Sequence, residues 1–291
     1  MLALQFIFTG LLTGGVYALI AVGIVLIYKS TRLFNFAVGE LMTLGGLICY
    51  SFVVWCKFPF WLSLPLVLIC AVLIGALVER LVLRPLLNQP ILTIVMATLA
   101  LSSFLKGLML IVWTGYTVTF PNNMLPGKAL LVGSIAMSHE LMWAFAIAMV
   151  AFLILAYFFV KTRTGLKMRA ISEDHELSMS CGINIVLFFA ITWIIAVILG
   201  ALSGVLLGNR LGLSPWTTPS IALKAFPAVL FGGLESIPGA IIGGLAVGLT
   251  ENLAGGFIDP KIGEITPYII LLLVLILRPE GLFGLKRIER I

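Results

Sequence analysis

The chain has 291 residues, of which 61% are hydrophobic and only 10% are charged, and its formal net charge is +6. Soluble domains carry roughly 25% charged residues, so this composition excludes an ordinary soluble protein and indicates several membrane crossings. The positive charge indicates basic loops and not a nucleic-acid surface. The cysteines lack metal-ligand spacing and are predicted to be small buried side chains, so no metal or cofactor is expected (Cys49, Cys56, Cys70, Cys181).

A membrane-spanning helix needs about 20 apolar residues. Six runs satisfy this requirement: Leu4–Tyr28, Val38–Cys56, Leu62–Leu83, Ile91–Trp113, Met142–Val160 and Ile185–Gly208. The first run has no basic segment before it and no cleavage site, so it is expected to be a permanent span. The broken region Leu223–Gly256 is predicted to supply two crossings, and Thr266–Leu277 a last one. These segments give at most nine crossings, and we expect an all-α polytopic protein with about eight transmembrane helices in one domain over residues 1–291.

The distribution of Lys and Arg predicts the orientation. With the amino end outside, twelve of the 18 basic residues lie in one set of loops and five in the other, while Lys106 lies within a span. The first set is Lys29, Arg32, Arg80, Arg84, Lys161, Arg163, Lys167, Arg169, Arg278, Lys286, Arg287 and Arg290, and the outer set is Lys57, Lys128, Arg210, Lys224 and Lys261. Cytoplasmic loops carry the excess of positive charge. Residues 161–184 and the carboxyl-terminal tail are therefore predicted to be cytoplasmic, and the loops 114–141 and 209–222 to be outside.

Two segments, 31–46 and 224–248, interrupt the apolar pattern with polar residues, glycines and prolines. Non-helical backbone survives at membrane depth only where protein or water covers it, and paired broken helices indicate a translocation path. An amide could orient a zwitterion and a neighbouring aromatic ring could pack an apolar side chain. The alternatives are an Asn that caps the next helix and glycines that only allow close packing. The candidate path residues are Asn35, Phe36, Gly39, Glu40, Gly232 and Gly233.

Residues 161–184 form a charged segment between apolar runs. Gly165 is predicted to let the chain turn, and Leu166–Ile171 to form a short helix. Ser172 is predicted to cap a second short helix, with Glu173, Asp174 and Glu176 in its first turn and Gly182 just after its end. Two short helices at a bend suit insertion into a groove on another protein. A solvated connecting loop is an equal alternative.

Charged residues inside spans are costly and indicate function or pairing. Glu40 could line the path or cap its helix. Lys106 could pair with Glu40 or Glu251, or extend to the membrane edge. Glu251 is predicted to lie at a solvated helix end near the outside, and the alternative for it is a gate. At the opposite interface we expect a salt bridge that joins Glu79-Arg80 and Arg84.

Several short motifs resemble those of one family in the same order along nearly the whole chain. They are Tyr17-Ala18-Leu19, Asn35–Glu40, Glu79-Arg80 with Arg84-Pro85-Leu86, Gly165 with Arg169-Ala170, Asp174, Gly182-Ile183-Asn184, Gly232-Gly233, Ile237–Ala240, Gly243-Gly244 and Arg278–Gly284. The chain resembles the branched-chain amino acid permease family of bacterial ABC importers. One departure is Leu177-Ser178, where the family usually has Ala-Ala.

The resemblance implies a function, a site and partners. It makes residues 161–184 the cytoplasmic loop that couples the permease to an ATPase, through Gly165, Leu166, Arg169, Ala170, Asp174, Gly182 and Ile183. It implies an inner-membrane protein with a second permease subunit, two cytoplasmic ATPase subunits and a periplasmic solute-binding protein. The cargo would be branched-chain or other hydrophobic amino acids, or alternatively urea, amides or small organic acids.

The sequence does not indicate an enzyme. It has no G-x-x-x-x-G-K-[ST] loop for ATP and no H-E-x-x-H pair, and its two aspartates, Asp174 and Asp259, do not form a membrane dyad. Two other non-enzymatic hypotheses stay open. One is a secondary transporter or channel that uses Glu40, Lys106 and Glu251 as an ion relay, and the other is a scaffold that binds an ATPase without transport.

Overall fold

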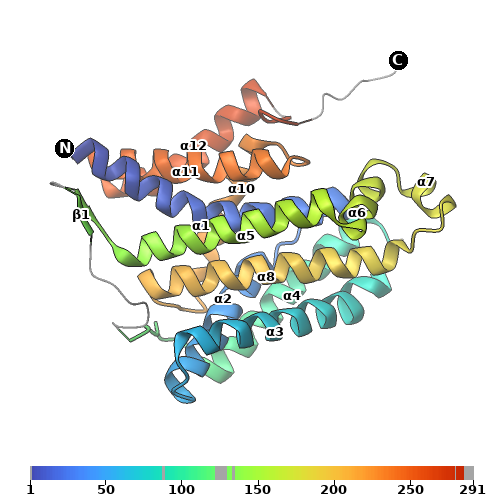
Figure 1. The fold of residues 1–291 in the computed structure, drawn as a ribbon, viewed down its shortest axis with the longest axis horizontal. Helices are drawn as coiled ribbons and strands as arrows, with labels where there is room; N and C mark the ends of the chain where they lie inside the picture. The colour runs from blue at the N-terminus through green and yellow to red at the C-terminus, as the bar shows by residue number, and fades with distance from the viewer. Residues whose placement is uncertain (1, 87–88, 122–129, 133–134, 279, 285–291) are drawn as a thin grey trace.

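The computed structural model describes residues 2–86, 89–121, 130–132, 135–278 and 280–284. These residues form an elongated bundle whose long helices run along one axis (Figure 1). The helices are α1 (Leu2–Thr31), α2 (Val38–Tyr50), α3 (Phe60–Val78), α4 (Ile91–Trp113), α5 (His139–Lys161), α6 (Arg163–Glu173), α7 (His175–Ser180), α8 (Ile185–Leu211), α9 (Thr218–Ala222), α10 (Ala225–Gly232), α11 (Ile237–Phe257) and α12 (Pro260–Leu277). Turns of π-helix extend α2 over Ser51–Trp55 and α3 over Glu79–Leu83, followed by a 3₁₀ turn at Arg84–Leu86. The predicted all-α architecture is confirmed.

Within the described residues, eight helices are long and apolar enough to cross a membrane. The broken region Leu223–Gly256 supplies one of them, α11, and the short α10, which follows α9 so that Thr218–Gly232 forms an interrupted apolar segment. The last span begins at Pro260 and not at Thr266. Proline suits the first helical turn, and Asp259 caps the helix because its Oδ1 accepts a hydrogen bond from Lys261 N–H (2.8 Å).

One short hairpin lies in the loop predicted at 114–141. Strands β1 (Leu130–Val132) and β2 (Ile135–Met137) pair antiparallel, with Leu130 opposite Met137. Of the four cysteines predicted to be buried, only Cys49 is. Cys56 and Cys181 are exposed because each follows the last residue of a helix.

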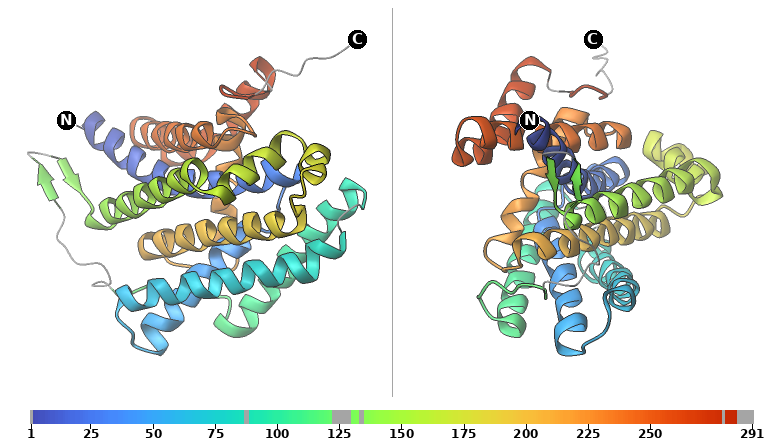
Figure 2. Two further views of the ribbon diagram at one scale, coloured as in Figure 1. Left: turned by 45° about the vertical axis from the view of Figure 1, so that its right-hand side comes forward. Right: turned by 60° about the vertical axis from the view of Figure 1, so that its left-hand side comes forward.

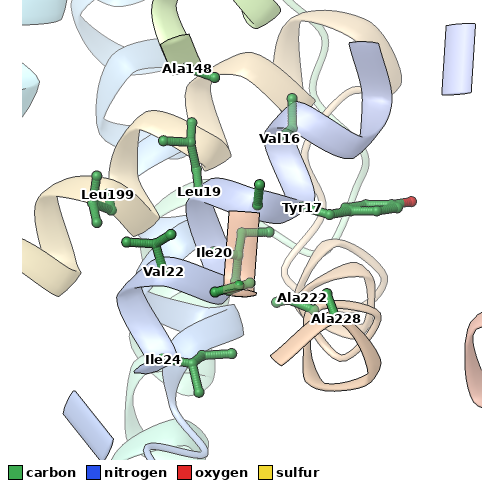
Figure 3. Packing of buried hydrophobic residues seen from close by; sticks show 14 of the residues in the cluster. Val16, Tyr17, Leu19, Ile20, Val22, Ile24, Ala148, Leu199, Ala222 and Ala228 are labelled. Carbon is green, nitrogen blue, oxygen red and sulfur yellow. The ribbon is translucent and has the colours of Figure 1, made fainter. Parts of the chain in front are cut away.

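Helix α1 is the centre of the bundle. It contacts α5, α8, α10 and α11, and its side chains are buried continuously from Thr13 to Ile27. Figure 3 shows Leu19 and Val22 facing Leu199 of α8, while Tyr17 points toward the α9–α10 region. Figure 2 shows α11 and α12 on one side of α1, and α3 and α4 beyond α8 on the other.

Small residues determine how closely α1 and α11 approach. A Cβ added at Gly14 would lie 2.8 Å from Leu245 Cα, and one at Gly244 would lie 2.5 Å from Ala18 Cα. Gly10 and Gly14 on α1 and Gly244 and Gly248 on α11 each repeat at a four-residue spacing. This small-xxx-small pattern brings two backbones into contact in membranes.

The two ends of the bundle differ. Helices α6 and α7 lie at one end, and the amino end of α1 and β1 lie at the other (Figure 1). Lys29, Arg32 and Arg169, which were predicted to share a side, line one cavity at the α6 end. The basic tail residues Lys286, Arg287 and Arg290 and the loop residue Lys128 lie outside the described residues. Which end faces the cytoplasm stays a prediction.

Candidate translocation path and the α6–α7 hairpin

The first predicted break is a short non-helical connection that ends in a turn at residues 36–37. Helix α1 ends at Thr31, α2 begins at Val38, and between them Asn35 is only 2% exposed. Asn35 Oδ1 accepts a hydrogen bond from Ala37 N–H (2.9 Å), which satisfies a backbone donor just before α2. Asn35 does not cap α2, because the N-cap residue is Ala37 and no side chain caps this helix. Its hydrogen bond holds the turn just before the helix. Glu40 lies buried in the first turn of α2.

The second predicted break is confirmed in two places. A turn at Leu223–Lys224 separates α9 from α10, and Gly233–Ser236 separates α10 from α11. Gly233 has φ +101°, a conformation that favours glycine. A Cβ at Gly232 would collide with the backbone of Gly239, so this glycine allows α10 and α11 to touch. The close-packing explanation therefore accounts for Gly232.

The fold brings the two breaks together. The ring of Phe36 stacks on that of Phe226 at a centroid distance of 6.1 Å, and Phe34 lies 6.3 Å from the same ring. Near the start of α2, a Cβ at Gly39 would lie 3.0 Å from Pro219 Cα of α9. Phe36 is 38% exposed although its neighbours Asn35 and Ala37 are buried. Two interrupted helices thus lie side by side, with an accessible aromatic ring between them.

An ion pair that the sequence analysis missed anchors the second break. Lys224 Nζ lies 2.5 Å from Glu251 Oε1, with the two side chains 16% and 14% exposed. The prediction that Glu251 lies at the end of its helix was wrong, because α11 continues to Phe257. Lys224 had been assigned to an outer loop. The sequence did contain a signal for this ion pair, because Lys224 and Glu251 are opposite charges within one broken, apolar region.

Two other predicted charge pairs are not formed. Lys106 lies over the ring of Trp216, with Nζ 4.2 Å from the centroid, and pairs with neither Glu40 nor Glu251. Glu79 is buried and its Oε1 has no hydrogen-bond partner among the described residues, whereas Arg80 is exposed. Residues i and i+1 of a helix do not face each other, which separates Glu79 from Arg80.

In the charged segment 161–184, α6 packs against the last turn of α5. Thr162 Oγ1 accepts a hydrogen bond from Gly165 N–H (3.0 Å) and caps α6. Gly165 was predicted to lie at a turn, but it lies inside α6. A Cβ there would lie 2.6 Å from Phe159 Cα, so glycine is needed for contact with α5. Met168 and Ile171 are buried against α8.

Helix α7 is the second predicted short helix, but its cap differs. Asp174 Oδ1 accepts a hydrogen bond from Leu177 N–H (2.9 Å), so Asp174 is the cap. Ser172 and Glu173 lie in the last turn of α6, where Ser172 Oγ donates to Arg169 O (2.7 Å). The helix α6 continues beyond the predicted Ile171, which moves the start of α7 by two residues.

The end of α7 is as predicted. Gly182 follows the helix with φ +77°. Its N–H donates to Met179 O (2.9 Å), and Ile183 N–H donates to Ser178 O (3.1 Å). These two bonds form a Schellman motif, in which a left-handed glycine ends the helix. Asn184 then caps α8 by accepting from Leu187 N–H (3.3 Å).

The outer face of α6 and α7, which we call the hairpin face, is apolar and exposed. It comprises Leu166, Ala170, Leu177 and Met179. Leu166, Leu177 and Met179 are between 55% and 63% exposed, and Arg169 beside them is also exposed. Leu177 and Ser178 are the two residues at which this chain departs from the family pattern. Leu177 lies on the hairpin face, whereas Ser178 is buried.

The comparisons with known proteins identify the family. The profile described as branched-chain amino acid transport system / permease component matches residues 6–276. The chain belongs to this family. It is 30% identical to the high-affinity branched-chain amino acid transport system permease protein LivH of Salmonella typhimurium over 99% of this chain and 97% of that protein. It is 29% identical to BraD of Pseudomonas aeruginosa over 99% and 98%, and 27% identical to the ribose import permease RbsC of Haemophilus influenzae over 81% and 73%.

The chain is thus a multi-pass membrane protein of a family of transport permease components. Beside α6 and α7, a cavity of about 580 Å³ is lined by residues of α1, α5, α6, α8 and α11. Its wall includes Lys29 of α1, Phe152 of α5, Arg169 and Glu173 of α6, and Ile241 of α11. Helix α6 is therefore held mainly through α5, with smaller contacts to α7 and α1, and it borders this cavity.

Proposed function

We propose that this chain is the membrane-spanning subunit of an ABC importer that moves branched-chain or other hydrophobic amino acids into the cytoplasm. Separate ATPase subunits supply the energy. In this arrangement residues 161–184 and the carboxyl terminus are cytoplasmic, and the protein lies in a bacterial inner membrane. The family match supports branched-chain amino acid transport as the class of transport. So do relatives named for that transport, which this chain matches over almost their whole length.

The hairpin face carries the proposal that the energy comes from a partner. Leu166, Leu177 and Met179 are exposed at a bundle end that is rich in charge, while Met168 and Ile171 on the inner face are packed against the spans. Such an amphipathic helix pair fits a hydrophobic groove on another protein. Because the inner face is packed against α8, movement of the hairpin would be transmitted to the spans.

The partners follow from the same arrangement. One ATPase subunit would bind the hairpin of this chain, and a second would bind the corresponding element of a second permease subunit. A periplasmic solute-binding protein would deliver the amino acid to the opposite end. The two breaks, with Asn35, Phe36, Gly39 and Glu40 in one and Gly232 and Gly233 in the other, are proposed to form this chain's wall of the path.

Reconstitution tests the proposal. The chain, its second permease subunit and the ATPase subunits are placed in liposomes with ATP inside, and the loaded binding protein is added outside. We expect uptake of labelled leucine that depends on ATP and on every subunit. Gradient-driven uptake by the chain alone would indicate a secondary transporter. ATPase binding with no transport would indicate a scaffold. Uptake of urea, amides or organic acids in place of leucine would revise the substrate.

A further inference from the structure

The Lys224–Glu251 pair lies where three elements meet. Lys224 lies in the turn between α9 and α10, Glu251 lies on α11, and Tyr17 of α1 is close enough to interact with Glu251. The second carboxylate oxygen, Oε2 of Glu251, is buried and has no hydrogen-bond partner among the described residues. The first carboxylate oxygen is thus held by an ammonium group, while the second can accept a further donor.

The pair lies in the half of the bundle that is remote from the hairpin. Glu251 precedes the end of α11 by six residues, which is about 9 Å along a helix. That end lies against the first turns of α1, because a Cβ at Gly256 would touch the ring of Phe6. Nearby, Arg210 of α8 donates to Thr13 of α1 (2.9 Å). A solute that enters from this end therefore reaches charged groups before it reaches the hairpin end.

A buried ion pair constrains what can open it. Removing one partner leaves an uncompensated buried charge, which is strongly unfavourable. Lys224 and Glu251 can therefore separate inside the protein only if other charges replace each of them. An amino acid carries an ammonium and a carboxylate on one carbon, and so it can replace both at once. A neutral amide or a simple carboxylate replaces at most one of them.

We propose that Lys224 and Glu251 bind the charged groups of a zwitterionic amino acid within this permease. The ammonium group of the substrate contacts Glu251 and its carboxylate contacts Lys224. Binding replaces the ion pair and releases the α9–α10 turn from α11, which links substrate recognition to movement of the broken segment. This inference rests on the proposed function as an amino acid importer.

The test removes the pair without leaving a lone charge. In K224M/E251L both partners become apolar, a change that buried pairs often tolerate. We expect this variant to insert in the membrane and to assemble with the ATPase subunits. We expect leucine uptake to fall at least about 100-fold, as when a site loses the polar groups that recognise its substrate. Uptake near the wild-type rate would overturn the proposal and make the pair a structural contact only.

Two further variants complete the design. K261Q removes an exposed charge at the start of α12, outside both breaks, and is expected to keep uptake within about threefold. K224E/E251K restores a pair with reversed polarity, so it should assemble even if K224M/E251L does not. Its uptake should stay low, because the substrate would have to bind in the reverse direction. Full uptake by K224E/E251K would also overturn the proposal. If wild-type uptake does not depend on ATP, the proposed function fails instead.

Discussion

Gly182 offers a direct way to loosen the hairpin without touching the spans. It adopts φ +77°, and a Cβ built there meets no atom within 4 Å, so a side chain at this position would be strained by the backbone and not by crowding. A left-handed conformation costs an L-residue about 1–2 kcal/mol, which changes a conformational equilibrium about 5–30-fold. Helix α7 has only six residues and depends on this termination, because so short a helix is marginal by itself.

We therefore expect Gly182→Val to uncouple ATP hydrolysis from uptake. The variant should insert in the membrane and bind the ATPase subunits more weakly, and the number of ATP molecules hydrolysed per leucine transported should rise about fivefold or more. Gly182→Asn is the matched control, because Asn tolerates the left-handed region and should keep the ratio close to wild type. Equal ratios for Gly182→Val and wild type would refute the reasoning, as would equal losses in both variants.

Three further changes test other contacts. Arg169→Glu reverses a charge beside the hairpin face and should uncouple hydrolysis from uptake without reducing membrane insertion; full transport would count against the coupling role. Phe36→Ala and Phe226→Ala should each lower uptake, and their double-mutant cycle should give a coupling energy of about 0.5–1.5 kcal/mol; additive effects would mean that the stacked rings do not act together. Gly14→Leu should prevent stable folding because α11 fills the space, whereas Gly107→Leu, where no atom lies within 4 Å, should fold normally in a thermal unfolding assay in detergent.

The spans could be predicted because each depends mainly on its own sequence. An apolar run of the required length is sufficient to identify a transmembrane helix, and the six such runs correspond to α1, α2, α3, α4, α5 and α8. The start of α12 was misplaced because Pro260 and Asp259 were read as loop residues, although proline and aspartate also begin helices. Similarly, Ser172 and Asp174 are both good caps, and only the extension of α6 to Glu173 decides between them.

The parts of the site that were missed depend on contacts between distant segments. The stacking of Phe36 on Phe226 and the pairing of Lys224 with Glu251 follow from how α9, α10 and α11 pack around α1. No local periodicity carries this information. Lys106 shows the same limit, since its aromatic partner Trp216 lies far away in the sequence. The sequence identified which residues break the pattern, while the fold determined which of them meet.

The most direct test of the central claim is ATP-dependent uptake with and without the hairpin contact. Proteoliposomes that contain this chain, its second permease subunit and the ATPase subunits should accumulate leucine from the loaded binding protein only when ATP is inside. Replacing the three exposed residues Leu166, Leu177 and Met179 by Ser should abolish both the association with the ATPase subunits and the uptake. Leucine accumulation that persists without ATPase subunits, or that survives the loss of the hairpin face, would contradict the account.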